Sequence, residues 1–281
     1  MKMLNAAIEW VLYTSLFAAC CAVGMCMATE LLVIKYIPLL FTSLHFLVFG
    51  STLLVYNVHH IVKRSAASRS DIFRWSLQYK GWHFFFSVLG VLMAGASLYR
   101  LSWKIWLGCV VLALLSFAYS LPLLPFTRRK RIRDFGWIKI LVLTSVWTIV
   151  TSILPLLYWG EPLSDYPYEI LLRFVFMFTL CVAFDVRDMQ TDLDAGIHTL
   201  PNIIGLRNSY RLMNVSIAFF GLLSIIQYLR YPSVTRLVGE LLTALATKWA
   251  IEYTKKHPTD KAYLGVVDGM MLLYAILVLI H

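Results

Sequence analysis

The stretch ILLRFVFMFTLCVAFDVRDMQTD, residues 170–192, joins an apolar run to regularly spaced aspartates. Asp185, Asp188 and Asp192 stand at i, i+3 and i+7, which share one face of a helix with about 3.6 residues per turn. Three carboxylates on one face repel each other unless a cation lies between them. Because Mg²⁺ binds one or two carboxylates together with substrate phosphates, the spacing indicates a Mg²⁺ site for a phosphorylated ligand. The alternative is an acidic helix end that faces water.

The composition of the whole chain places this stretch in a membrane protein. Of the 281 residues, 60% are hydrophobic and only 14% are charged, which is too apolar for a soluble domain of this length. Nearly the whole chain divides into apolar spans of about 20 residues, the length that crosses a bilayer. We therefore predict an all-α polytopic membrane protein, a single domain over 1–281, with nine transmembrane helices near 8–29, 33–56, 82–99, 104–121, 138–158, 167–184, 209–229, 234–252 and 263–280.

The basic residues alternate between the two sides of these predicted spans. The net charge is +10, and most Lys and Arg residues fall in every second connection, as the positive-inside bias requires of cytoplasmic loops. This bias explains the charge without nucleic-acid binding, and it predicts a cytoplasmic N-terminus. The five cysteines lie in apolar spans without zinc-type spacing and are expected to pack in the membrane. No cleavable signal peptide is expected.

A second polar cluster follows the second predicted span on the same side as the aspartates. Asn57, His60 and Arg64 repeat the i, i+3, i+7 spacing, so two facing polar clusters are expected to close on a phosphate group. The alternative is that Asn57 caps a helix end and that the other two residues are interfacial anchors.

Three further positions are candidate binding residues. Lys139 opens the fifth predicted span, where a cation can reach a diphosphate at the rim; its alternative is ordinary snorkelling. Asp268 lies about one turn into the last span, and ionisable residues within a membrane favour function. It is expected to pair with Lys139 or a rim arginine, to serve an acceptor pocket, or to cap a helix near the interface. Tyr119 precedes Ser120-Leu121-Pro122 and the basic run 128–133.

The motifs resemble those of the UbiA superfamily of membrane prenyltransferases. The aspartate run and its tail are similar to the second aspartate-rich motif of that family, and the segment from Tyr119 to Lys139 resembles its loop after the fourth span. The resemblance covers essentially the whole chain. It departs from the family at the first motif, normally Asn-Asp-x-x-Asp-x-x-x-Asp, because the matching segment around Asn57 contains no aspartate.

The resemblance implies a Mg²⁺-dependent transfer of a prenyl group from a prenyl diphosphate to an aromatic or other lipophilic acceptor. It implies that Asp185, Asp188 and Asp192 hold Mg²⁺, and that the substrate-binding residues are Asn57, His60, Arg64, Tyr119, Lys139 and Asp268. The expected location is a bacterial inner membrane, with the active site facing the cytoplasm. The alternative is a non-catalytic or transport-type protein with the same bundle. A CDP-alcohol phosphotransferase ranks lower, because its Asp-Gly and Ala-Arg pattern does not follow Asp185.

Overall fold

The computed structural model describes residues 2–34, 41–62, 71–120, 136–194 and 196–279. In these residues the protein is all-helical except for a two-residue strand. The elements are α1 (Lys2–Tyr13), α2 (Leu16–Ile34), α3 (Ser43–Val62), α4 (Asp71–Gln78), α5 (Lys80–Leu98), α6 (Trp103–Ser120), α7 (Gly136–Thr148), η2 (Ile149–Ile153), α8 (Leu154–Trp159), η3 (Leu163–Asp165), α9 (Pro167–Asp194), β1 (His198–Thr199), α10 (Leu200–Ile204), α11 (Leu206–Arg230), α12 (Val234–Lys256), η4 (Ala262–Val267) and α13 (Gly269–Leu279).

Several helices have the length and composition of membrane spans. Five of those in the described segments are long and apolar enough to cross a bilayer: Leu16–Val33, Ser43–Val62, Lys80–Leu98, Trp137–Trp159 and Leu206–Arg230. The protein is therefore an integral membrane protein. The other predicted spans coincide with α6, α9, α12 and the segment from η4 to α13, and their crossing of the membrane stays a prediction.

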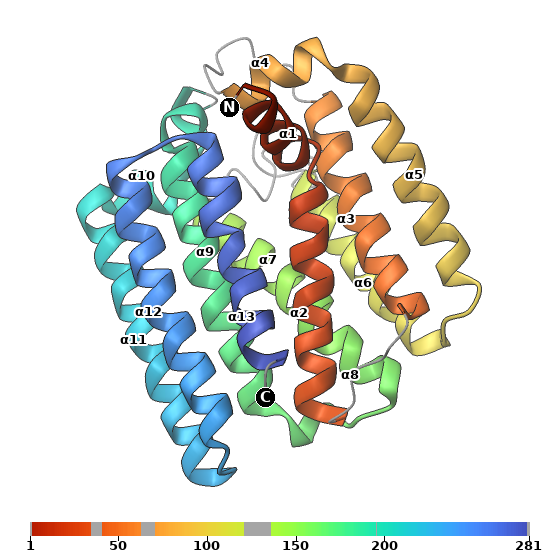
Figure 1. Cartoon of the computed structure of the whole chain (residues 1–281), viewed down its shortest axis with the longest axis vertical. Helices are drawn as coiled ribbons and strands as arrows, with labels where there is room; N and C mark the ends of the chain where they lie inside the picture. The colour runs from red at the N-terminus through yellow and green to blue at the C-terminus, as the bar shows by residue number, and fades with distance from the viewer. Residues whose placement is uncertain (1, 35–40, 63–70, 121–135, 195, 280–281) are drawn as a thin grey trace, which may run out of the picture.

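The long helices form a ring, and α2 lies between its two halves. This helix packs against α3 and α8 on one side and against α13 on the other, and the ring continues from α7 through α9, α11 and α12 back to α13. Figure 1 shows most of these helices running along the long axis of the molecule, with α1 and α4 at one end and the last turn of α13 directed toward the other. The carboxyl end of α9, which carries the aspartates, lies at the same end as α1 and α4.

The boundaries of the first two predicted spans, 8–29 and 33–56, were wrong, the second because α3 covers Ser43–Val62. The chain breaks between α1 and α2, because Ser15 adopts a left-handed backbone with a φ of 62°. The break is stabilised from another helix: Asn57 on α3 donates its amide Nδ2 to the Thr14 carbonyl at 3.0 Å. The spanning helix therefore begins at Leu16, and α1 is a separate helix at the end of the bundle (Figure 1).

A second break lies in the middle of the bundle, where α7 passes through the π-helical turn η2 into α8. Pro155 has no N–H, so the Thr151 carbonyl four residues earlier loses its helical donor. Thr29 on α2 donates its hydroxyl to this carbonyl at 2.7 Å, and Cys26 donates its thiol to the Val150 carbonyl at 3.3 Å. The irregular helix is thus satisfied by the helix that it packs against.

Buried ion pairs join α9 to α12 at the end of the bundle opposite the aspartates. Arg173, of which only 2% is exposed, donates to Glu169 at 3.4 Å and to Thr29 at 2.8 Å. Glu169 also accepts from Arg236, which donates to Glu240 at 2.8 Å. This group of Glu169, Arg173, Arg236 and Glu240 is named the α9–α12 ionic network. Two acids and two arginines leave it neutral, as buried charges require.

The closest helix contact joins α3 to α5 through two glycines. A Cβ atom built on Gly90 lies 2.5 Å from the Gly50 carbonyl oxygen and 2.9 Å from the Leu54 nitrogen, so no larger residue fits without backbone movement. Small residues at such crossings are the usual basis of helix association in membranes. The contact holds the helix that carries Asn57 against its neighbour.

We expect Gly90→Ala to destabilise the protein by about 2 kcal/mol, because the added methyl group meets backbone atoms that cannot move independently. Gly95→Ala is the matched control on the same helix, where the added Cβ meets nothing within 4 Å. The control should be neutral or slightly stabilising, since alanine is the better helix former. Reversible unfolding in detergent micelles measures both variants, and equal stabilities would contradict the close-packing argument.

Candidate functional site

The three aspartates lie in the last turns of α9, which continues without interruption to Asp194. Asp185 is buried with 2% of its surface exposed, whereas Asp188 and Asp192 are half-buried. The helix ends at Asp194, and Gly196 beyond it has a φ of 72°, which suits glycine. The three aspartates therefore lie on one helix, as their spacing predicts, and Asp185 is the deepest of them.

Lys139 on α7 connects two of the aspartates. Its Nζ atom lies 2.8 Å from Asp185 Oδ1 and 2.8 Å from Asp192 Oδ2, so one ammonium bridges carboxylates that stand seven residues apart. Lys139 is 9% exposed, and this partial burial strengthens both contacts relative to a surface ion pair. Lys139, which the sequence places at the opening of a span, thus lies within the aspartate cluster.

Arg187 supplies the second cation. Its Nε and Nη2 atoms donate to the two oxygens of Asp188 at 2.8 and 3.0 Å, a bidentate pair. The guanidinium carbon lies 4.8 Å from the centre of the Phe184 ring and 6.0 Å from that of Tyr263. This aromatic packing fixes Arg187 between α9 and η4, beside the aspartates.

The donor set suits Mg²⁺ although the carboxylates do not converge on one point. Asp185 Oδ2 is buried and accepts no hydrogen bond from the described residues, which leaves an acceptor open to a ligand. Among the residues that the structure describes, no three His, Cys, Asp or Glu side chains are close enough together to hold a metal ion. The physical reason is that Lys139 stands between Asp185 and Asp192, and that Asp188 pairs with Arg187.

The three residues of the second polar cluster, Asn57, His60 and Arg64, do not share one role. Asn57 is fully buried; its amide donates to the Thr14 and Leu53 carbonyls, and its oxygen lies 2.7 Å from His83 Nδ1. His60 packs against the His83 ring at 5.0 Å between centroids. Arg64 lies outside the described residues. Asn57 therefore links α1, α3 and α5, and its polar atoms are engaged away from the aspartates.

Tyr56, next to Asn57, is the residue of α3 that reaches toward α9. Its hydroxyl interacts with Trp147 and lies within electrostatic range of Asp268 and Arg187. Asp268, which follows η4 and is 8% exposed, lies in turn within electrostatic range of Arg187. Residues of α3, α7 and α9 thus lie near Asp268, at the junction of η4 and α13.

The comparisons with known proteins give the same assignment. The sequence profile of the UbiA prenyltransferase family matches residues 72–274, more than half of the chain. The chain belongs to the UbiA prenyltransferase family. No curated protein matches its sequence. The family match begins after Asn57, His60 and Arg64, the segment in which the first aspartate motif is missing.

Solved structures of UbiA proteins share the fold over almost the full length. A UbiA homolog from Archaeoglobus fulgidus bound to GPP and Mg²⁺ has a TM-score of 0.59 and 13% identity, covering 98% of both chains. The same homolog bound to Cd²⁺ has a TM-score of 0.55 and 12% identity, covering 98% of this chain and 97% of that chain. A digeranylgeranylglyceryl phosphate synthase has a TM-score of 0.53 and 14% identity, covering 99% of this chain and 98% of that chain.

Some residues of this UbiA site were not identified from the sequence. Arg187 lies inside the quoted aspartate run, but only the folded structure shows that its guanidinium turns back onto Asp188. Tyr56 and Trp147 resemble the many other aromatic residues of the spans, and no spacing distinguishes them. Tyr119 belongs to α6, and the position of its side chain lies outside what the structure describes.

Proposed function

We propose that this UbiA protein transfers a prenyl group from a prenyl diphosphate to an aromatic or other lipophilic acceptor. The observation that carries the proposal is the cluster of Asp185, Asp188 and Asp192 with Lys139 and Arg187 at one end of α9. Three acids and two cations within hydrogen-bonding distance form a site that matches a diphosphate together with a divalent cation.

We infer that Asp185, Asp188 and Asp192 hold Mg²⁺ when the substrate is bound. The ion would neutralise the diphosphate and so make it a better leaving group. Its binding requires Lys139 to leave at least one carboxylate, which the flexible four-carbon stem of lysine allows. The open Oδ2 atom of Asp185 is the first oxygen available to the ion. Lys139 and Arg187 then donate hydrogen bonds to diphosphate oxygens.

The reaction breaks the bond between the first prenyl carbon and the diphosphate oxygen, and the electron pair leaves with the diphosphate. A nucleophilic atom of the acceptor forms the new bond to that carbon and loses a proton. Cations that touch the diphosphate stabilise the charge that develops on it. The region beneath the aspartates, where the half-buried Tyr56 and Trp147 approach the buried Asp268, is the proposed acceptor side, because it lies toward the membrane interior.

The remaining predicted positions have unequal support. His60, Arg64 and Tyr119 stay proposed substrate-binding residues. Asn57 is better explained as a positioning residue, because its amide and oxygen hold Thr14 and His83 rather than facing α9. Arg64 is the proposed replacement for the missing first aspartate motif, since a guanidinium can bind diphosphate without a metal.

The test is turnover by purified protein in lipid nanodiscs. Labelled prenyl diphosphates of several chain lengths are supplied with a membrane lipid extract, with Mg²⁺ or with EDTA. We expect a labelled lipophilic product that forms only with Mg²⁺, and release of diphosphate in equal amount. Diphosphate binding without any transfer would instead support the alternative, a non-catalytic or transport-type protein with the same bundle. The loss of every aspartate from the first motif is the observation that favours this alternative.

We also propose the membrane arrangement of the chain. All 281 residues would form one UbiA-like domain with nine transmembrane helices, a cytoplasmic N-terminus and an active site facing the cytoplasm of a bacterial inner membrane. The alternation of basic loops supports this orientation. The opposite placement of α1 and the last turn of α13 in Figure 1 suits an odd number of crossings.

A further inference from the structure

A groove on the outside of the bundle lies between α3 and α5, at the end opposite the aspartates. It has a volume of about 410 Å³ and is lined by Ser43, Phe46, Leu92, Met93, Ala96, Ser97 and Arg100. That volume is within the range of small-molecule sites. The groove belongs neither to the aspartate cluster nor to the region around Tyr56, so the proposed prenyl transfer does not account for it.

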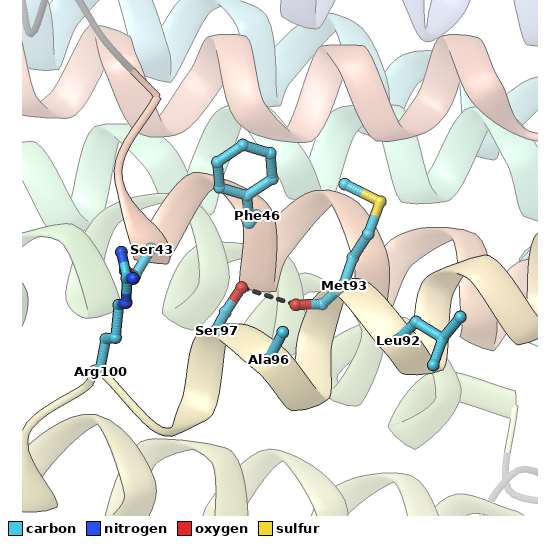
Figure 2. A pocket seen from close by; sticks show the side chains of 7 residues that line it. All are labelled: Ser43, Phe46, Leu92, Met93, Ala96, Ser97 and Arg100. Atoms are coloured by element: carbon cyan, nitrogen blue, oxygen red, sulfur yellow. Dashed lines mark hydrogen bonds between the residues drawn. The ribbon is translucent and has the colours of Figure 1, made fainter.

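The groove exists because small side chains face each other on two tightly packed helices. Gly50 and Gly90 bring the backbones of α3 and α5 together, and from there to the end of α5 the seam is flanked by Ser43, Ala96 and Ser97. Ser97 turns its hydroxyl back to the Met93 carbonyl at 2.6 Å and so leaves the space beside it unfilled (Figure 2).

The lining of the groove changes from polar to apolar along the axis that we propose to cross the membrane. Figure 2 shows Arg100 and Ser43 at one end of the groove and Met93 and Leu92 at the other. Arg100 lies just beyond the end of α5, whereas Leu92 lies six residues before that end, a rise of about 9 Å along the helix. Tyr99 and Trp103, which are 93% and 71% exposed, flank Arg100 and mark the level of the lipid headgroups. A polar end at the headgroup level and an apolar end at acyl-chain depth match the shape of a lipid.

The charge at the polar end is uncompensated by acidic residues. Among the described residues none forms an ion pair with Arg100, and the sequence has no acid between Asp71 and Asp134. Glu30, the acid nearest in sequence to the Ser43 end of α3, is already bound by His45 at 2.9 Å and by Trp159 at 3.0 Å. An arginine in this setting favours an anion, and phosphate is the anion that its forked donors fit best.

We propose that the α3–α5 groove binds an anionic membrane phospholipid, with the phosphate on Arg100 and one acyl chain along Phe46, Ala96 and Leu92. The lipid fills the seam of the helix pair that Gly50 and Gly90 hold together. In the proposed orientation the groove faces the outer leaflet, and its single arginine gives the selection of an anionic headgroup a defined position.

The experiment is native mass spectrometry of the detergent-solubilised full chain, titrated with palmitoyl-oleoyl phosphatidylglycerol or with the matching phosphatidylcholine. We expect one phosphatidylglycerol to bind about tenfold more tightly than phosphatidylcholine. Arg100→Gln should abolish this preference. Ala96→Phe, which fills the groove, should weaken both lipids by about tenfold. Lys104→Gln is the control, because Lys104 is exposed one turn away and does not line the groove.

Three results would overturn the proposal. The wild type binding both lipids equally would show that the occupant is not selected by charge. An unchanged preference in Arg100→Gln, or an equal loss in Lys104→Gln, would show that the attraction is not local to Arg100. Should Arg100→Gln fail to fold, Ala96→Phe decides alone: unaltered phosphatidylglycerol binding excludes the groove, and weakened binding with an unchanged melting temperature supports it.

Discussion

Asp185→Asn and Asp188→Asn should each lower prenyl transfer at least a thousandfold, roughly 4 kcal/mol of transition-state stabilisation. The expected loss is large because an amide oxygen cannot replace a carboxylate in neutralising Mg²⁺ and diphosphate. Folding should persist, since asparagine has nearly the same shape. Steady-state kinetics with the prenyl diphosphate measure the effect, and far-ultraviolet circular dichroism checks the fold.

Asp194→Asn is the matched control for both variants. Asp194 ends the same helix two residues beyond Asp192, is exposed, and accepts a hydrogen bond from Gln190 at 3.0 Å. Its replacement should leave the rate within about twofold of wild type. Rates within about threefold of wild type for both Asp185→Asn and Asp188→Asn would remove these residues from the metal site.

Lys139→Met should destabilise the protein by about 3 kcal/mol in EDTA, because it leaves Asp185 and Asp192 without the ammonium that now touches both. Added Mg²⁺ should restore much of this stability, since a divalent ion can take the place between the carboxylates. The wild type should gain less, because Lys139 competes with the ion. Thermal unfolding with and without Mg²⁺ measures the difference.

Lys248→Met is the matched control for Lys139→Met, because it also removes one positive charge. Lys248 is exposed on α12, and its replacement should change neither the stability nor its dependence on Mg²⁺. Equal Mg²⁺ responses in the wild type and in Lys139→Met would contradict the proposal that Lys139 and the ion share the same carboxylates.

Much of the fold follows from apolar length alone, because a spanning helix needs about 20 apolar residues. The spans of α5 and α11 were found within a few residues for this reason, whereas the second predicted span, 33–56, begins and ends well before α3. The first span was misplaced because its start depends on a tertiary contact. Asn57 binds the Thr14 carbonyl from 43 residues away, and no local signal around Thr14 or Ser15 indicates this contact.

The candidate site, like the fold, was predictable only in part. Periodicity was sufficient to place three aspartates on one face of a helix, since all three lie within α9. It could not show which cations approach them, because Lys139 is 46 positions before Asp185 (185 − 139) and reaches it only when α7 packs on α9. Asn57 shares its i, i+3, i+7 spacing with His60 and Arg64, yet its partners are set by α1 and α5 rather than by that pattern.

The α9–α12 ionic network has a consequence for the biogenesis of the protein. Neither α9 nor α12 is among the five described helices that are apolar enough to cross a bilayer by themselves. Arg236 reaches the translocation machinery 67 residues after Glu169. Helix α9 is therefore synthesised with Arg173 as the partner of Glu169, but well before the charges of α12 exist. Charged groups at a helix end that lack partners resist entry into lipid. We therefore expect stable insertion of α9 to await α12. Chains truncated before Arg236 should remain anchored by their five apolar helices, with α9 incompletely inserted, and be degraded.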